Sequence, residues 1–355
     1  MERIPMGESA RKGDAALIIK VFSTCPQSKD VQASRYLRAV ADVAVWSEAA
    51  GCAGILVYTD NGIVDPWLVS QVIIQSTERL GPLVAIQPVY LHPYAAAKMV
   101  ASLAFMHGRR VYLNMLAGGF KNDLVALGDQ TPHDERYART IEYTQIMMGL
   151  LSTAGPVTLD GAYYQVNNLR MTPAMPPDLA PEVLISGSSP AGLAAARTLG
   201  ATPVKYPQPP GEESPPTGEG VEEFGIRVGI IAREDPNEAW RVAYQRFPED
   251  RKGQITHKLA MSVSDSHWHH QLSKRDSAAG GDEGSEPNPY WLGPFQNYKT
   301  FCPYLVGSYE RVARELAHYV ELGSTTFILD IPASRDELEH IGVVFAQARN
   351  AIVGS

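Results

Sequence analysis

Cysteine is scarce in this chain, and its placement excludes two kinds of site. The 355 residues include three cysteines, Cys25, Cys52 and Cys302, which lie far apart and in no C-x-x-C spacing. This pattern matches neither a disulfide framework nor a zinc site, so we expect no bound metal and a reducing compartment.

Long hydrophobic runs are missing as well. The first 14 residues are polar and carry no apolar stretch of the kind that forms a signal peptide. No run reaches the roughly 18 uninterrupted apolar residues that a membrane-spanning helix needs. We therefore expect a cytoplasmic protein with no membrane partner.

Positive charge is in deficit. Lysine and arginine number 31 against 39 aspartates and glutamates, which leaves a formal net charge of −8. Such a chain repels phosphate backbones and anionic surfaces, so we expect no nucleic-acid partner. With 45% hydrophobic and 20% charged residues, the composition is that of a folded chain with a sizeable core.

Several common catalytic motifs are absent. The chain contains no G-x-G-x-x-G, G-x-x-x-x-G-K-[ST], G-x-S-x-G or H-E-x-x-H sequence. This argues against dinucleotide-binding, P-loop, α/β-hydrolase and zincin sites.

What the chain does contain is a repeated alternation of short β-branched runs and helical patterns. Eight such runs, most of them followed by a helical pattern, predict a single (β/α)8 TIM barrel over residues 1–355, with residues 1–14 disordered. The expected strands are 17–22, 54–58, 83–87, 110–115, 182–186, 201–205, 224–232 and 326–330.

Three segments interrupt this rhythm. Residues 153–181 carry turn signals and aromatic residues, and predict a β-hairpin inserted before the fifth strand. Residues 207–223 are rich in proline and glycine, so we expect no helix of two or more turns there. Residues 262–303 predict a long loop after the seventh strand, whose centre, 273–289, we expect to be a mobile lid.

The sequence Ser186-Gly187-Ser188-Ser189-Pro190 joins the fifth strand to a helix. Ser189 suits the helix N-cap and Pro190 the first helical position. Exposed backbone N–H groups, the positive helix end and two hydroxyls would suit a phosphate. A plain helix cap explains the same residues, so both interpretations stay open.

One arginine falls within the apolar seventh strand. Alternation places Arg227 on the same face as Gly229, and a buried guanidinium needs either an internal carboxylate or an anionic ligand. Lys20 and Lys205, on the first and sixth strands, raise the same question.

Four histidines form the other conspicuous group: His257, His267, His269 and His270. They lack a carboxylate partner at helical spacing, and their segment has no helix signal. We expect a solvated loop rather than a metal site.

The residues that follow the strands resemble those of a known family. Residues 110–119 (RVYLNMLAGG), 133–137 (HDERY), 187–189 (GSS) and 224–227 (FGIR) occur in order along the eight-strand pattern. Together they resemble the bacterial-luciferase-like flavin monooxygenases, in particular the reduced-FMN-dependent alkanesulfonate monooxygenases. The resemblance implies reduced FMN at the carboxyl ends of the strands, O2 as co-substrate, a separate flavin reductase, and a homodimer or homotetramer.

The same resemblance implies roles for individual residues. Ser188 and Ser189 correspond to phosphate ligands, and Arg227 to a catalytic arginine at the mouth of the active site. The remaining cofactor-binding residues that it implies are Asn114, His133 and Tyr137.

The chain departs from the sulfonate enzymes at four positions. Their active-site cysteine, histidine, tyrosine and lid arginine correspond here to Ile63, Gly229, Ile331 and Tyr298. We therefore expect a two-component monooxygenase of specialised metabolism that oxygenates a small-molecule organic substrate other than a sulfonate. Two alternatives stay open: a deazaflavin-dependent oxidoreductase of the same superfamily, and a flavin-binding relative without catalysis.

Overall fold

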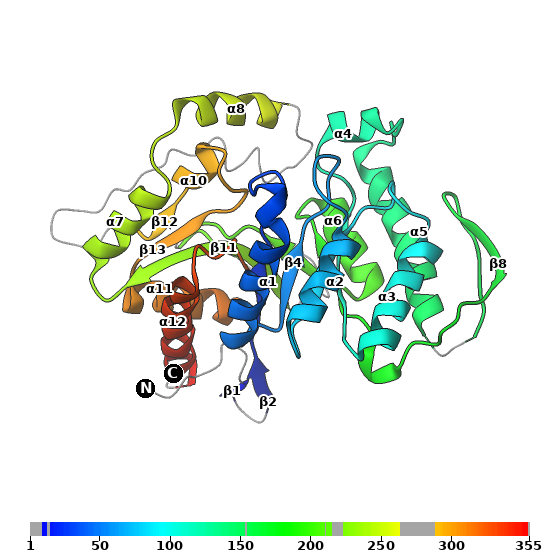
Figure 1. The fold of residues 1–355 in the computed structure, drawn as a ribbon, viewed down its shortest axis with the longest axis horizontal. Helices are drawn as coiled ribbons and strands as arrows, with labels where there is room; N and C mark the ends of the chain where they lie inside the picture. Colours follow the sequence, from blue (N-terminus) through cyan, green and yellow to red (C-terminus); the bar gives the residue numbers. More distant parts are fainter. Residues whose placement is uncertain are drawn as a thin grey trace. The chain divides into compact units, whose positions relative to one another are not determined.

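The computed structural model describes residues 9–12, 15–152, 155–209, 211–214, 223–262 and 288–353. Its strands and helices follow one another along the colour gradient of Figure 1. In chain order they are β1 (Ser9–Lys12), β2 (Ala15–Ile18), β3 (Lys20–Thr24), α1 (Ala33–Ala49), β4 (Gly54–Val57), α2 (Pro66–Ser76), β5 (Gly81–Ile86), α3 (Pro93–His107), β6 (Tyr112–Leu116), α4 (Lys121–Ala126), α5 (His133–Leu151), β7 (Val157–Asp160), β8 (Gln165–Leu169), η1 (Pro177–Leu179), β9 (Val183–Ser186), α6 (Pro190–Leu199), β10 (Thr202–Lys205), β11 (Phe224–Arg233), α7 (Pro236–Arg246), α8 (Arg251–Ser262), β12 (Tyr290–Trp291), α10 (Gly293–Gln296), β13 (Tyr304–Ser308), α11 (Tyr309–Glu321), β14 (Ser324–Leu329) and α12 (Arg335–Val353).

All eight predicted strands are present, as β3, β4, β5, β6, β9, β10, β11 and β14. A helix follows each of them except β10, where residues 206–209, 211–214 and 223 contain none. This succession is that of a (β/α)8 barrel, so the predicted fold class is confirmed. Residues 9–12, within the stretch expected to be disordered, form β1, which pairs with β2.

The chain divides by its contacts into two compact units. The central unit comprises Cys25–Ala44 and Gly54–Val204, and the terminal unit comprises Met1–Thr24, Val45–Ala53 and Lys205–Ser355. The single domain over the whole chain stays a prediction. Among the helices that the structure describes, none is long and apolar enough to cross a membrane.

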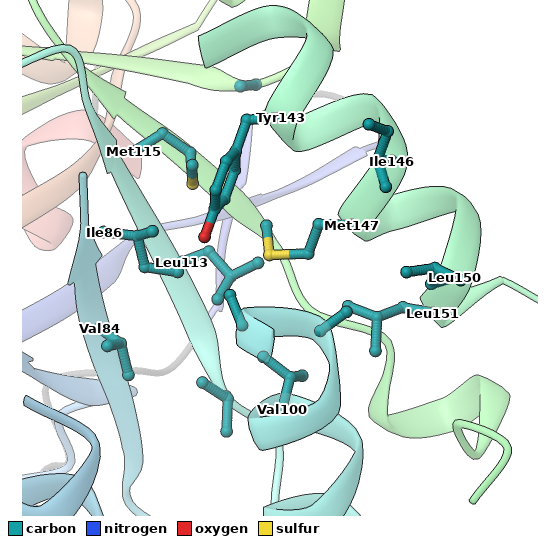
Figure 2. Close-up of a cluster of buried hydrophobic side chains, with 14 of the residues drawn as sticks. Val84, Ile86, Val100, Leu113, Met115, Tyr143, Ile146, Met147, Leu150 and Leu151 are labelled. Atoms are coloured by element: carbon teal, nitrogen blue, oxygen red, sulfur yellow. The ribbon is translucent and has the colours of Figure 1, made fainter. Parts of the chain in front are cut away.

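The central unit contains five parallel strands in the order β4-β5-β6-β9-β10. Helices α3 and α5 pack over this sheet, and their inner faces fill a core with residues of β5 and β6. Figure 2 shows Tyr143 and Met147 of α5 against Leu113 and Met115 of β6. The core thereby fixes α5, whose first residues belong to the candidate site.

The predicted hairpin is confirmed as the antiparallel pair β7–β8. Glu142 of α5 holds its turn, because the carboxylate accepts hydrogen bonds from the backbone N–H groups of Ala162, Tyr163 and Tyr164 at 2.8–3.0 Å. A Cβ atom at Gly161 would lie 2.3 Å from Glu142 Oε2, so a larger residue there would displace this carboxylate.

The terminal unit contains β3, β14 and β11 in parallel. Strand β11 is long enough to serve two neighbours: Phe224–Val228 pairs with β14, and Gly229–Arg233 pairs with β13. A second core lies around Trp240, Phe247, Trp291 and Tyr304.

The segment expected to be a long loop is partly ordered secondary structure. The predicted mobile lid lies almost entirely outside the described residues, but residues 288–303 include β12 and α10, and β12 pairs with β13. Helix α8 and strand β13 were not predicted from the sequence. Strand β13 has only five residues and pairs with β11, which is distant in sequence. Helix α8 buries His257 and Met261 but leaves Ile255 and Leu259 exposed, so its apolar pattern is weak.

One histidine prediction is wrong. His257 lies on α8 rather than on a solvated loop, is 5% exposed, and packs its ring against Phe295 at 4.5 Å. Burial lowers its pKa. His267, His269 and His270 lie outside the described residues.

Candidate active site

The loop of residues 186–190 lies at the carboxyl end of β9, where it leads into α6. Ser189 is the N-cap of α6, and its side chain accepts a hydrogen bond from the backbone N–H of Gly192 at 3.1 Å. Pro190 occupies the first helical position, as predicted. The loop thus directs the positive end of a ten-residue helix toward the carboxyl edge of the sheet.

Glycine is required within this loop because another side chain comes very close. Gly187 has a φ of +156°, and a Cβ atom there would lie 2.1 Å from the hydroxyl oxygen of Tyr137. A Cβ atom on Gly192, the third residue of α6, would lie 3.1 Å from the same oxygen. Tyr137 therefore lies directly against the backbone of the loop and the start of α6.

The loop also contains a polar atom suited to a ligand. Ser188 Oγ is buried and has no hydrogen-bond partner among the described residues. A buried hydroxyl without a partner is costly, and a phosphate oxygen at the start of α6 would satisfy it. The start of α6, the buried hydroxyl of Ser188 and the backbone of Gly187 together fit a phosphate group such as that of a flavin nucleotide.

Two further predicted residues lie in the same part of the central unit. Asn114 of β6 is 4% exposed, and its Oδ1 accepts a hydrogen bond from Ser186 Oγ at 2.9 Å. Tyr137 is hydrogen-bonded to Ser189; its burial raises its pKa, and that bond opposes the rise. The structure therefore brings together Asn114, Tyr137, Ser188 and Ser189, which are distant in sequence.

His133 lies next to this group at the first position of α5. Its ring packs edge-on against Tyr137 at 5.3 Å, and its Nδ1 lies 2.7 Å from Asp134. The His133 side chain is 31% exposed, so it lies at the solvent-facing edge of this group of residues rather than beneath the 186–190 loop.

The loop that leads into α5 is held by groups that the sequence analysis missed. Asp129 accepts hydrogen bonds from Thr131 and, at 2.6 Å, from Arg139. Burial of Asp129 would raise its pKa, but the bonds from Arg139 and Thr131 outweigh it and lower the pKa to about 2. This network fixes the backbone immediately before His133.

The terminal unit holds the predicted catalytic arginine. Arg227 of β11 is nearly buried, and its Nη2 lies 3.9 Å from Oδ1 of Asp330, directly after β14. The other carboxylate oxygen accepts a hydrogen bond from the Tyr304 hydroxyl at 2.8 Å. We call Arg227, Tyr304 and Asp330 the Arg227 cluster; the last two were not predicted, because nothing local marks them.

The two strand lysines differ from each other in their surroundings. Lys205 lies 2.5 Å from Glu213, which is buried, so the internal ion pair weighed from the sequence is confirmed. Lys20 is half-buried on β3. Among the described residues, no group of three or more His, Cys, Asp or Glu side chains could hold a metal ion.

One departure from the sulfonate enzymes, Gly229 in place of their histidine, has a steric explanation in the structure. A Cβ atom on Gly229 would lie 2.3 Å from the ring of Tyr304, which is its neighbour across the β11–β13 pair. The space that a histidine would need at this position is therefore filled by Tyr304.

The succession of strands and helices is that of a (β/α)8 barrel, and a loop suited to a phosphate follows β9 at its carboxyl end. Residues 18–326 match the model of the luciferase-like monooxygenases, and the chain belongs to that family. It is 34% identical, over 307 residues, to the 4-(γ-L-glutamylamino)butanoyl-[BtrI acyl-carrier protein] monooxygenase BtrO of Niallia circulans, covering 85% of this chain and 89% of that protein.

Solved structures show the same fold at low sequence identity. Riboflavin lyase RcaE, with modified FMN and its substrate riboflavin, matches with a TM-score of 0.67 and 15% identity, over 95% of this chain and 96% of that one. An F420-dependent secondary alcohol dehydrogenase, in complex with an F420-acetone adduct, matches with a TM-score of 0.64 and 14% identity, over 93% and 99% of the two chains.

Proposed function

We propose that this luciferase-like monooxygenase is the oxygenase of a two-component system, which uses reduced FMN and O2 to oxygenate a small organic substrate other than a sulfonate. A separate flavin reductase supplies the reduced FMN, and the enzyme is a homodimer or homotetramer. The observation that carries the proposal is the 186–190 loop, where a buried, unsatisfied serine hydroxyl lies at the start of α6.

The residues of the loop have separable tasks. The backbone N–H groups at the start of α6 and the hydroxyls of Ser188 and Ser189 would hold the phosphate, and the hydroxyl of Tyr137 lies beside them. Asn114, which is hydrogen-bonded to Ser186, and His133, at the start of α5, would orient the cofactor. When bound, reduced FMN would supply the electrons that activate O2, while the protein supplies position and electrostatics.

The substrate class follows from what the chain lacks and from its relative. The cysteine, histidine and tyrosine of the sulfonate enzymes correspond to Ile63, Gly229 and Ile331, and the place of the histidine is sterically filled. The relative from Niallia circulans is named for an acyl group carried on a carrier protein. A carrier-bound acyl thioester is therefore the first substrate class to test, with free carboxylic acids as the comparison.

A deazaflavin-dependent oxidoreductase is the second candidate, because a structural neighbour binds an F420 adduct. The 186–190 loop would serve the phosphate of either cofactor equally well. The third alternative is a flavin-binding relative without catalysis, and turnover of any substrate would exclude it.

One series of measurements tests these alternatives. Under anaerobic conditions, the protein is titrated with reduced FMN, reduced riboflavin and reduced F420. We expect tight binding of reduced FMN and much weaker binding of riboflavin, which lacks the phosphate. Preferential binding of F420 would overturn the FMN assignment. Incubation with ¹⁸O2, reductase and acyl thioesters should then give a product that contains one labelled oxygen atom.

A further inference from the structure

One face of helix α8 packs closely on α10, in the same terminal unit (Figure 1). The ring of His257 lies 4.5 Å from that of Phe295, and Gln254 donates a hydrogen bond to Asn297 Oδ1 at 3.1 Å. A Cβ atom on Gly253 would lie 2.1 Å from the carbonyl oxygen of Asn297. Because these contacts hold the inner face of the helix, they also define which residues form its outer face.

The outer face of α8 carries exposed apolar side chains with charges around them. Ile255 and Leu259 lie one turn apart and are 62% and 67% exposed. Helical spacing places Arg251, Lys252 and Lys258 on the same side of the helix, and all three are exposed. An exposed apolar patch with a polar rim is one mark of a surface that binds another macromolecule. We call these five residues the α8 face.

The charge of the α8 face has one sign. On other helices, an exposed arginine pairs with an acid three or four residues away: Arg38 with Asp42, Arg241 with Glu238, Arg314 with Glu310 and Arg335 with Glu339. Residues 251–262 contain no aspartate or glutamate, so α8 offers its cations no such pair. Of the two acids before the helix, Asp250 lies 2.7 Å from Lys299, and Glu249 is exposed. The α8 face is therefore a positive patch on a chain of net charge −8.

We propose that the α8 face binds an acidic protein, namely the carrier protein that presents the acyl thioester proposed as substrate. Its three cations would meet carboxylates of the carrier and orient the encounter, while Ile255 and Leu259 would bury apolar area at the centre of the contact. Charge complementarity favours this partner, because the net charge of the chain repels an acidic protein elsewhere. This inference rests on the proposed function, because it assigns the place where the carrier of the proposed substrate binds.

An anionic membrane is the other surface that a basic helix could meet, and two features argue against it. A helix that lies in a membrane inserts a broad apolar face, whereas His257 and Met261 of α8 are buried against the protein. That leaves Ile255 and Leu259 to insert, and the net negative charge of the chain opposes the approach. The acidic protein is therefore the favoured partner, and vesicle binding becomes one outcome of the test.

Binding of the carrier is measured without catalysis, so that neither flavin nor turnover enters the result. The probe is an acyl-carrier protein with an excess of acidic residues, in its butanoyl-thioester form, and calorimetry gives the dissociation constant. Lys252→Glu/Lys258→Glu should weaken binding by about tenfold or more, and Ile255→Ser by about three- to tenfold. Added salt should weaken binding to the wild type more than binding to the charge-reversed variant.

Arg241→Glu/Arg314→Glu is the matched control, because it changes the net charge by the same amount at exposed positions of two other helices in the same unit. It should alter the dissociation constant by less than about twofold, since charges far from the contact are screened. Glu249→Gln should leave binding unchanged or tighten it. If Lys252→Glu/Lys258→Glu does not fold, Lys252→Gln/Lys258→Gln carries the comparison.

The inference is overturned if the wild type does not bind the carrier, or if both double variants lose affinity equally. It is also overturned if the wild type binds vesicles of phosphatidylcholine and phosphatidylserine and Lys252→Glu/Lys258→Glu abolishes that binding.

The proposed function fails or stands separately. If reduced FMN binds and butanoyl-pantetheine is oxygenated, but the carrier does not bind through the α8 face, the proposed function stands and this inference is wrong. If the carrier binds through the α8 face and reduced FMN does not bind, the cofactor assignment is wrong and the assignment of the α8 face stands.

Discussion

The 186–190 loop and the Arg227 cluster achieve a polar site by opposite means. The loop is made by five consecutive residues, and its groups are backbone N–H, a cap hydroxyl and a second serine. The Arg227 cluster takes one residue from each of three separate segments, and its groups are a guanidinium, a carboxylate and a phenol.

This difference has consequences for stability and for recognition. The loop leaves a polar atom unsatisfied, so a ligand would complete it. The cluster balances its charges internally, so removing one member exposes another as a buried charge. We expect substitutions in the loop to affect binding more than folding, and substitutions in the cluster to affect folding as well.

Loss of the carboxylate should have the largest effect. Asp330→Ala leaves Arg227 and the Tyr304 hydroxyl without this partner in a nearly buried place, so the free energy of unfolding should fall by about 3–5 kcal/mol. Chemical denaturation measures this. Glu182→Ala is the control, because its ion pair with Arg110 is about one-third exposed and should contribute less than about 1 kcal/mol. Equal losses in both variants would contradict the contrast.

The serines of the loop should show the reverse pattern. Ser188→Ala and Ser189→Ala should each weaken reduced-FMN binding by about ten- to a hundredfold, because each removes a charge-assisted hydrogen bond. Ser189→Ala alone should also lose about 1 kcal/mol of stability, because it removes the cap.

Ser308→Ala is the matched control for this pair. Ser308 caps α11 by accepting a hydrogen bond from the N–H of Arg311 at 3.2 Å. It should therefore lower stability like Ser189→Ala and leave the affinity for reduced FMN unchanged. If neither Ser188→Ala nor Ser189→Ala changes the affinity for reduced FMN, the assignment of the 186–190 loop as the phosphate site is wrong.

Acid should destabilise the segment that leads into α5, because it protonates Asp129. The folded-state pKa of about 2 lies below the ordinary value of 3.8. The ionised carboxylate therefore stabilises the fold above pH 4, and about 2 kcal/mol is lost as the pH falls from about 4 to about 2. In Asp129→Asn this part of the acid dependence should be absent; an unchanged profile would show that the ion pair with Arg139 does not act on stability.

The smallest effect concerns two buried tyrosine hydroxyls. That of Tyr143 lies among the apolar side chains of Figure 2 and has no hydrogen-bond partner among the described residues, whereas that of Tyr304 donates to Asp330. Tyr143→Phe should raise the free energy of unfolding by up to about 1 kcal/mol, and Tyr304→Phe should lower it. Thermal melting of the two variants tests the contrast, and a loss of stability in Tyr143→Phe would contradict it.

The sequence by itself determined the barrel, the hairpin and the cap of α6. Each depends on neighbouring residues: alternating apolar runs make strands and helices, and Ser189 and Pro190 have preferences that act within one helical turn. The resemblance also selected Asn114, Tyr137, Ser188 and Ser189, and these do lie together. Their binding of a cofactor stays a prediction.

Tertiary structure decided what surrounds those residues. No local pattern connects Arg227 to Asp330 and Tyr304, because these contacts depend on strand order and register. The same holds for β13, which pairs with the second half of β11, and for His257, which a distant aromatic ring buries. A side chain's preference for a helix or strand acts over a few residues, whereas its ion pairs and burial depend on which distant segments the fold brings beside it.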